Sequence, residues 1–331
     1  MSWISTTSGK RFEALDSESM LDAALRQGVA LSYSCRTGRC SSCKGRLQAG
    51  DTVTAHEELG LSQRERDEGW ILTCVRRATS DVTIQVEDLG DVVLPAAKIL
   101  PCRIQSLERL APDVLKVVLR TPPTSPFTFL PGQYVDVIAA HGVRRSYSIA
   151  NAPRADKQLE LHVREVPGGA MSRYWFGQAK PADLLRLNGP LGTFFLRDLG
   201  GKDLVFLATG TGIAPVKSML EALPDLCQED QPRSVSVYWG GRAPEDMYWR
   251  PESPASTFRF EQVLSRAGPD WQGARGHVQD AFVADMPDLQ RTVVYACGSD
   301  TMIHSARSRL LELGLSDNAF HSDAFVCSAS P

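Results

Sequence analysis

The sequence has little of several features that would place it in a specialised class. Its net charge is only −3, from 36 Lys+Arg and 39 Asp+Glu, whereas proteins that bind nucleic acid are usually far more basic. No apolar run approaches the roughly 18 residues of a membrane span, and residues 1–6 lack the basic and apolar regions of an export signal. Internal repeats and low-complexity tracts are also missing. We therefore expect a cytoplasmic protein that binds neither nucleic acid nor membrane.

The composition is that of an ordinary globular protein. Of the 331 residues, 43% are hydrophobic, 23% are charged and 8% are aromatic, which excludes disordered, collagen-like and coiled-coil proteins. At about 100–200 residues for each domain, the length suits two or three domains.

Differences in pattern along the chain predict a multidomain α+β and α/β protein with three domains. Residues 1–90 combine helical and strand-like patterns around a cysteine-rich loop, and residues 91–101 are predicted to be a linker. Residues 102–198 contain short strand-like runs separated by turn residues, which predicts an antiparallel β-barrel. In residues 199–331 strands alternate with helices, which predicts a parallel sheet.

Eight cysteines in a chain of this length require an explanation. A disulfide framework explains them poorly, because a chain of this size needs no covalent cross-links and carries no export signal. Four of the cysteines lie in the first quarter of the sequence, and they are Cys35, Cys40, Cys43 and Cys74. This asymmetry indicates a metal site in a reducing compartment.

The spacing Cys-x4-Cys-x2-Cys, followed by a fourth cysteine after 30 intervening residues, is that of a plant-type [2Fe–2S] cluster. Gly38 permits the turn, and the short spacers let backbone N–H groups face the cluster sulfurs. A structural zinc site is the alternative, but zinc usually takes two Cys-x2–4-Cys pairs, and Cys74 stands alone. The fragment 31–43 resembles plant-type ferredoxins. The resemblance covers roughly residues 5–90 and implies a β-grasp fold in which the four cysteines bind the cluster.

Four basic residues surround this loop, and they are Arg36, Arg39, Lys44 and Arg46. They either dock an acidic partner or offset the negative charge of the cluster. The sequence leaves both interpretations open.

Two motifs in the middle segment favour a flavin. The tetrapeptide Arg-Ser-Tyr-Ser at 145–148 ends a strand-like run, and Gly-Gly-Ala-Met-Ser begins a helix-like stretch, where free N–H groups suit a phosphate. In this order the motifs resemble the ferredoxin–NADP⁺ reductase superfamily, in which they hold FAD. The resemblance implies that Arg145, Gly169 and Ser172 contact the pyrophosphate. It also implies that Tyr147 lies against the flavin ring and that Ser148 hydrogen-bonds near N5; FMN is the alternative cofactor.

Two motifs in the last segment favour a nicotinamide nucleotide. A hydrophobic strand runs into Thr-Gly-Thr-Gly-Ile-Ala-Pro at 209–215, a glycine turn that suits a pyrophosphate but differs from the dehydrogenase fingerprint G-x-G-x-x-G. Cys-Gly-Ser-Asp-Thr-Met at 297–302 follows another strand-like run, and ligands bind at the carboxyl ends of such strands. In the same superfamily these motifs flank the nicotinamide, which implies binding roles for Gly210, Thr211, Gly212, Cys297, Gly298 and Met302. Cys297 is expected near nicotinamide C4, but it also suits a small buried position.

Two further segments bear on the choice of nucleotide and on the flavin. Arg242, Glu245 and Asp246 follow a strand-like run where the adenosine ribose is expected. An acidic residue favours the 2′-OH of NADH, whereas an arginine accommodates the 2′-phosphate of NADPH; similarity to oxygenase-type reductases favours NADH. Phe325 lies in a C-terminal segment that resembles the superfamily, which implies that it covers the flavin ring, with core packing as the alternative.

Along its whole length the chain resembles the bacterial iron–sulfur flavoprotein reductases. The resemblance implies an NAD(P)H-dependent oxidoreductase that passes electrons from NADH to FAD, to the [2Fe–2S] cluster and then to a partner protein. The flavin is needed because NADH delivers two electrons together and the cluster accepts one at a time. The residues implied in catalysis are Tyr147, Ser148, Thr211 and Cys297.

The resemblance leaves the electron acceptor open between two classes of partner. One is an iron–sulfur dehydrase of deoxysugar biosynthesis, and the other is the terminal oxygenase of an aromatic-ring dioxygenase or multicomponent monooxygenase. A redox sensor that does not turn over is a third hypothesis. The intact nucleotide motifs argue against the sensor, because a sensor needs no nicotinamide site.

Overall fold

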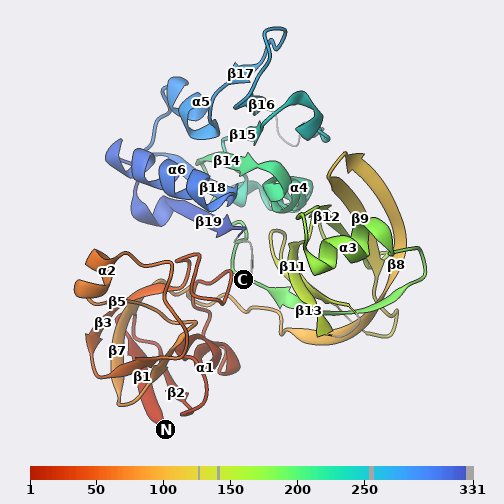
Figure 1. The fold of residues 1–331 in the computed structure, drawn as a ribbon. Coiled ribbons are helices and arrows are strands. Elements are labelled where there is room, and N and C mark those ends of the chain that lie inside the picture. Colours follow the sequence, from red (N-terminus) through yellow and green to blue (C-terminus); the bar gives the residue numbers. More distant parts are fainter. Residues whose placement is uncertain (126, 140–141, 253–256, 326–331) are drawn as a thin grey trace. The chain divides into compact units, whose positions relative to one another are not determined.

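The computed structural model describes residues 1–125, 127–139, 142–252 and 257–325 (Figure 1). The chain folds as two compact units, Met1–Leu94 with Asp323–Pro331, and Pro95–Ser322. Within the described ranges, no helix is both long enough and apolar enough to cross a membrane.

The first unit is built on a five-stranded mixed sheet with the strand order β2-β1-β7-β3-β5. β1 pairs antiparallel with β2 and parallel with β7, and β3 pairs antiparallel with β7 and β5. β4 and β6 form a separate antiparallel pair. The strands are β1 (Ser2–Thr6), β2 (Arg11–Ala14), β3 (Lys44–Ala49), β4 (Thr52–Thr54), β5 (Trp70–Leu72), β6 (Arg76–Ala78) and β7 (Val82–Val86). This arrangement confirms the predicted ferredoxin-like fold.

Both helices of the first unit begin at a serine cap. The Ser19 side chain accepts a hydrogen bond from the Asp22 amide at the start of α1 (Met20–Arg26), whose buried face packs into the core of the sheet. Gly28 follows α1 with φ +75°, as expected for a glycine that ends a helix. Ser62 forms a capping box with Glu65 in α2 (Gln63–Asp67).

The second unit begins with the predicted barrel. Its six strands are hydrogen-bonded in the order β11-β10-β13-β8-β9-β12, and neighbouring strands are antiparallel. A bridge between Ile149 and Leu161 joins the two ends of the sheet. β8 begins at Lys98, inside the expected linker, because residues 98–101 pair with β13. The elements are β8 (Lys98–Ala111), β9 (Val114–Arg120), β10 (Tyr134–Ile138), β11 (Arg144–Ser148), β12 (Gln158–Arg164), α3 (Ala170–Gly177) and β13 (Leu184–Leu191).

The remainder of the second unit is the predicted α/β domain. Its sheet has the order β17-β16-β15-β14-β18-β19, and the central strands are parallel. Its strands are β14 (Asp203–Thr209), β15 (Ser234–Gly241), β16 (Phe258–Leu264), β17 (Ala274–Arg275), β18 (Thr292–Gly298) and β19 (Phe320–Ala324). Its helices are α4 (Ile213–Ala222), α5 (Val278–Ala284), α6 (Asp300–Glu312) and the short 3₁₀ turns η2 (Gly210–Gly212), η3 (Leu223–Asp225), η4 (Gln228–Asp230), η5 (Pro244–Asp246) and η6 (Asp317–Ala319).

The order of this sheet places two predicted motifs next to each other. β14 and β18 are neighbouring parallel strands, with Ala208 opposite Cys297. The glycine turn that follows β14 and the Cys-Gly motif that ends β18 therefore meet at one edge of the sheet, where α/β folds bind their ligands.

Candidate functional site

The four predicted cluster ligands come together in the first unit as two pairs. Side-chain hydrogen bonds join Cys35 to Cys40 and Cys43 to Cys74. A [2Fe–2S] cluster contains two irons held by four thiolates, so two thiol pairs fit it. In the described part of the chain, no group of three or more His, Cys, Asp or Glu side chains could hold a single metal ion.

The loop that carries three of these cysteines points backbone amides at sulfur, as predicted. The Cys35 amide donates to Cys40 Sγ at 3.4 Å, and the Thr37 amide donates to Cys35 Sγ at 3.4 Å. Gly38 has φ +74°, and a Cβ at this position would lie 2.5 Å from the carbonyl oxygen of Glu57. Only glycine fits there.

Hydrogen bonding makes one thiol of each pair the more acidic. The bond with Cys40, together with amides of the loop, lowers the pKa of Cys35 to about 5 although burial acts in the opposite sense. The bond with Cys43 likewise lowers the pKa of Cys74, whereas the pKa values of Cys40 and Cys43 are raised by their partners and by burial. Thiolates are the form that binds iron.

The basic residues around the cluster loop have partners inside the protein. Arg39 interacts with another group of the protein. The other pairs are Arg36 with Asp22, Lys44 with Glu65 at 2.8 Å, and Arg46 with the Glu68 carbonyl at 3.1 Å. Their charges are therefore partly compensated before any partner protein binds.

In the second unit, the predicted flavin tyrosine is held by the helix that follows it. The Trp175 indole N–H of α3 donates to the Tyr147 hydroxyl at 3.0 Å, and the two rings meet edge to face with centroids 6.2 Å apart. Burial raises the pKa of Tyr147 to about 12, so the phenol stays neutral. Trp175 was not anticipated, although its place in the helix-like stretch after Gly-Gly-Ala-Met-Ser was a usable signal.

The start of α3 presents hydrogen-bond donors that no side chain caps. Its N-cap residue, Gly169, makes no side-chain capping bond, so the first-turn N–H groups lack a side-chain partner. The Ser172 hydroxyl accepts a hydrogen bond from the Val166 amide at 2.8 Å, which leaves its own O–H free to donate. These donors fit the pyrophosphate of FAD.

Two further predicted flavin residues, Arg145 and Ser148, lie on β11. Arg145 is partly exposed, and its Nη1 donates to the Arg144 carbonyl at 2.7 Å. Ser148 is buried at the end of the strand, opposite Tyr134 of β10. Trp175 thus connects α3 directly to the strand that carries Arg145, Tyr147 and Ser148.

The two nucleotide motifs pack against each other at the carboxyl ends of β14 and β18. A Cβ at Gly212 would lie 2.3 Å from the Cys297 carbonyl oxygen. Gly298 has φ +127°, and a Cβ there would lie 2.3 Å from Thr209 Oγ1. That hydroxyl also accepts a hydrogen bond from the Ser299 amide at 3.0 Å, and Ser299 caps α6 by accepting from the Met302 amide. The contact requires both glycines.

Residues of the same motifs differ in accessibility. Thr211 is partly exposed, whereas Cys297 is completely buried and Met302 nearly so. Phe325 directly follows β19 and is partly buried. The roles expected for these four residues stay predictions.

Two residues that lie against the glycine turn were missed. The Trp239 indole N–H of β15 donates to the Gly210 carbonyl at 2.9 Å. Arg164 Nη1, from the barrel strand β12, lies 2.7 Å from the position of a Cβ on Gly210. Arg164 Nη2 also donates to Asp246 Oδ1 at 3.0 Å. Nothing in the local sequence pairs these residues, because they are far apart in the chain.

Of the two carboxylates in the expected ribose region, Asp246 accepts hydrogen bonds and Glu245 is exposed. Asp246 Oδ2 accepts from the Arg242 amide at 2.7 Å, and its other oxygen binds Arg164, so Asp246 stabilises its own loop. Glu245 and the Arg242 side chain are exposed. Glu245 is therefore the carboxylate of this region that a nucleotide can reach.

A buried polar network that the sequence did not reveal fastens α4 to the barrel. Lys217 Nζ donates to the Ala150 carbonyl at 3.0 Å and lies 3.2 Å from Glu160 Oε1. His162 Nε2 lies 2.9 Å from the same oxygen. Burial alone would raise the pKa of Glu160, but His162 and Lys217 together lower it to about 2. Two ionisable residues inside a hydrophobic strand were the available signal.

Family models match the three segments separately. A 2Fe-2S iron-sulfur cluster binding domain matches residues 5–79. An oxidoreductase FAD-binding domain matches residues 101–196, and an oxidoreductase NAD-binding domain matches residues 206–308. These matches support the three cofactors predicted from the motifs.

Curated relatives share nearly the whole chain. The CDP-6-deoxy-L-threo-D-glycero-4-hexulose-3-dehydrase reductase of Yersinia pestis is 42% identical over 325 residues, which are 96% of each chain. Reductase component 1 of the terephthalate 1,2-dioxygenase of a Comamonas species is 33% identical, over 96% of this chain and 95% of that protein.

Solved structures show the same architecture. A cytochrome P450 reductase of Amycolatopsis superposes with a TM-score of 0.78 at 31% identity, covering 98% of this chain and 99% of that chain. The ferredoxin reductase of a carbazole 1,9a-dioxygenase has a TM-score of 0.72 at 26% identity, covering 98% of each chain. Given the paired cluster cysteines, the flavin strand and helix and the nucleotide motifs, the chain belongs to the iron–sulfur flavoprotein reductases, NAD(P)H-dependent oxidoreductases that use FAD and a [2Fe–2S] cluster to pass electrons to a partner protein.

Proposed function

We propose that this reductase supplies electrons to an iron–sulfur dehydrase that acts on a CDP-linked deoxyhexulose, which makes it a CDP-6-deoxy-Δ3,4-glucoseen reductase. The observation that carries the proposal is the 42% identity to the Yersinia pestis dehydrase reductase, against 33% to the terephthalate dioxygenase reductase over a similar length. The terminal oxygenase of a dioxygenase or monooxygenase is the alternative acceptor.

The barrel residues would bind and orient the flavin. Arg145 and the first turn of α3, with Gly169 and Ser172, supply donors for the pyrophosphate. Tyr147, whose hydroxyl is held by Trp175, presents its ring to the isoalloxazine, and Ser148 donates a hydrogen bond near N5. When bound, FAD supplies the conversion between two-electron and one-electron transfer.

The α/β domain would hold the nicotinamide nucleotide at the carboxyl ends of β14 and β18. The residues proposed to bind it are Gly210, Thr211, Gly212, Cys297, Gly298 and Met302. The Trp239 indole N–H bonds the Gly210 carbonyl and Arg164 lies beside Gly210, so the turn is supported before the nucleotide arrives. Phe325 is proposed to cover the flavin ring.

NADH is the proposed electron donor. Glu245 is exposed beside the end of β15 and can accept a hydrogen bond from a ribose 2′-OH, whereas it would repel a 2′-phosphate. The variant Glu245→Gln should reduce the ratio of kcat/KM for NADH to that for NADPH by at least fivefold. An unchanged ratio would show that Glu245 does not read the ribose.

The cluster bears on the compartment as well. Iron-binding thiolates persist where thiols are kept reduced, so we propose a cytoplasmic location. The proposed domains are residues 1–90, 102–198 and 199–331, with the first barrel strand, β8, reaching back to Lys98 in the linker 91–101.

The acceptor is tested by comparing two purified partners in separate assays. The FAD- and cluster-loaded reductase is mixed with NADH and either the CDP-6-deoxy-L-threo-D-glycero-4-hexulose-3-dehydrase of Yersinia pestis or the terephthalate dioxygenase oxygenase. We expect kcat/KM for the dehydrase to be at least tenfold higher. Equal or faster reduction of the oxygenase would contradict the proposal.

A spectral titration tests the relay itself. NADH added without oxygen should bleach both the flavin and the iron–sulfur absorption bands. If neither NADH nor NADPH bleached either band, the result would contradict the catalytic function and favour the sensor hypothesis.

A further inference from the structure

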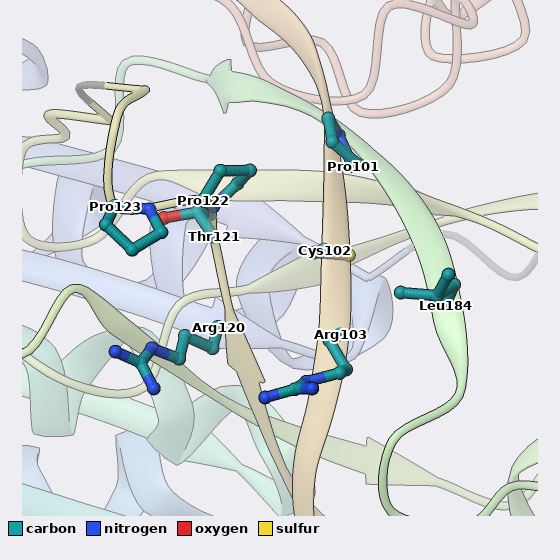
Figure 2. Close-up of a pocket in the computed structure, with 8 residues that line it drawn as sticks. All are labelled: Pro101, Cys102, Arg103, Arg120, Thr121, Pro122, Pro123 and Leu184. Carbon is teal, nitrogen blue, oxygen red and sulfur yellow. The ribbon is translucent and has the colours of Figure 1, made fainter.

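A pocket of ≈ 370 Å³ is formed at the strands of the barrel (Figure 2). It lies on β8, β9 and β13 and includes none of the residues proposed to bind the flavin or the nucleotide. Its volume is in the range of small-molecule sites. The residues that line it are Pro101, Cys102, Arg103, Arg120, Thr121, Pro122, Pro123 and Leu184.

Two arginines face each other across this pocket's strands. Arg103 of β8 is the register partner of Arg120 in β9, and like charges directly opposite each other destabilise an antiparallel pair. Within the described residues, neither guanidinium has an acidic or hydrogen-bonding partner. Further along the same ladder, Glu108 lies opposite Lys116 and forms an ion pair with it. The charges of Arg103 and Arg120, unlike those of Glu108 and Lys116, are therefore not compensated across the two strands.

The remaining walls are apolar and rigid. Three prolines and Leu184, which is 78% exposed, border the pocket. Burial raises the pKa of Cys102 to about 12, so its thiol is neutral and serves as an apolar wall. Thr121 is 2% exposed, and its hydroxyl has no hydrogen-bond partner among the described residues, which costs stability.

We propose that this pocket binds a small organic anion. Its carboxylate or phosphate lies between the guanidiniums of Arg103 and Arg120, which donate charge-assisted hydrogen bonds, and its apolar body lies against the prolines and Leu184. The anion removes the repulsion across the ladder, and the Thr121 hydroxyl is the further donor available to it. No covalent step is involved.

The test uses the FAD- and cluster-loaded full chain with three probes at constant ionic strength: benzoate, phenyl phosphate and inorganic phosphate. Isothermal titration should show saturable binding of benzoate or phenyl phosphate, with the better of the two identifying the head group. Inorganic phosphate should bind at least fivefold more weakly, because it lacks an apolar body. If neither organic anion bound saturably, the proposal would be overturned.

Paired variants locate the binding. The double variant Arg103→Gln/Arg120→Gln should weaken binding at least tenfold. The matched control is Arg186→Gln, because Arg186 is exposed on β13 opposite Pro101 but does not line the pocket. Binding that survived in the double variant, or that fell equally in the control, would place the anion elsewhere.

The repulsion between Arg103 and Arg120 can also be tested without a ligand, by thermal unfolding. Arg120→Glu places opposite charges at these two positions, so the melting temperature should rise, and added benzoate should no longer raise it further. A lower melting temperature in Arg120→Glu would show that the two arginines are not an unfavourable pair.

Discussion

At the scale of single residues, the cluster depends on Cys74, the ligand supplied from outside the cysteine loop. Replacing it with serine removes one thiolate from the pair with Cys43. We expect Cys74→Ser to lose cytochrome c reduction through the cluster by at least 50-fold, while NADH-dependent dye reduction through the flavin falls less than threefold. Cys227→Ser, at an exposed thiol, should change neither rate. Full cytochrome c reduction in Cys74→Ser would show that Cys74 is not a ligand of the cluster.

The Tyr147 hydroxyl is a second residue-scale test, because it is the partner of a buried donor. Tyr147→Phe leaves the Trp175 N–H unpaired and should lower the free energy of unfolding by about 1–3 kcal/mol in urea, measured at fixed FAD concentration. In a double-mutant cycle, adding Trp175→Phe should cost much less than it does in the wild type. Additive costs would mean that the bond contributes nothing.

At the scale of elements, the contact between the ends of β14 and β18 depends on Gly298. A methyl group there meets Thr209 Oγ1 and also strains a backbone with φ +127°, so the two motifs must move apart. We expect Gly298→Ala to raise KM for NADH at least tenfold, measured by dye reduction. Gly314→Ala is the control, because Gly314 has φ +99° with nothing within 4 Å. The Gly314→Ala variant should be less stable than the wild type but should have an unchanged KM for NADH. An equal rise in KM in this control would show that general backbone strain causes the effect of Gly298→Ala.

At the scale of the whole molecule, stability should fall as the pH drops below about 6.5. Burial lowers the pKa of His321 to about 3, and Arg197 donates to its Nδ1 at 3.0 Å, so the folded state keeps the ring neutral. Between pH 6.5 and 3 the unfolded chain therefore binds a proton that the folded chain does not. This stability is fully present above pH 6.5 and is lost as the pH falls. The lowered pKa of buried His162 acts in the same direction.

The measurement is urea unfolding of the full chain at pH 7.5 and pH 5, followed by tryptophan fluorescence. His321 should account for about 2 kcal/mol of the difference. His321→Asn should remove that part, whereas His56→Asn, at an exposed position, should leave it intact. Burial raises the pKa of Asp323 to about 6, which has the opposite pH dependence, so the comparison between variants is the decisive one. An unchanged difference in His321→Asn would contradict the assignment.

Much of the fold and the cofactor motifs could be predicted because their signals are local. Cys35, Cys40 and Cys43 lie within nine residues of one another, and a glycine turn directly after a hydrophobic strand identifies a phosphate loop by its own geometry. Strand alternation and the change to strand–helix rhythm identified the barrel and the parallel sheet. The strand pairing of residues 98–101, within the predicted linker, was not anticipated because their pairing partner, β13, is remote in sequence.

The sequence by itself determined the cofactor set, because each cofactor requires a short run of residues with fixed spacing. Only the tertiary structure decided how those runs are held. Trp175 reaches Tyr147 across 28 positions and Arg164 reaches Asp246 across 82, and the facing of Arg103 and Arg120 follows from strand register. Side-chain hydrogen bonds and cross-strand charges depend on distances in space, which the folded backbone sets and local spacing does not encode.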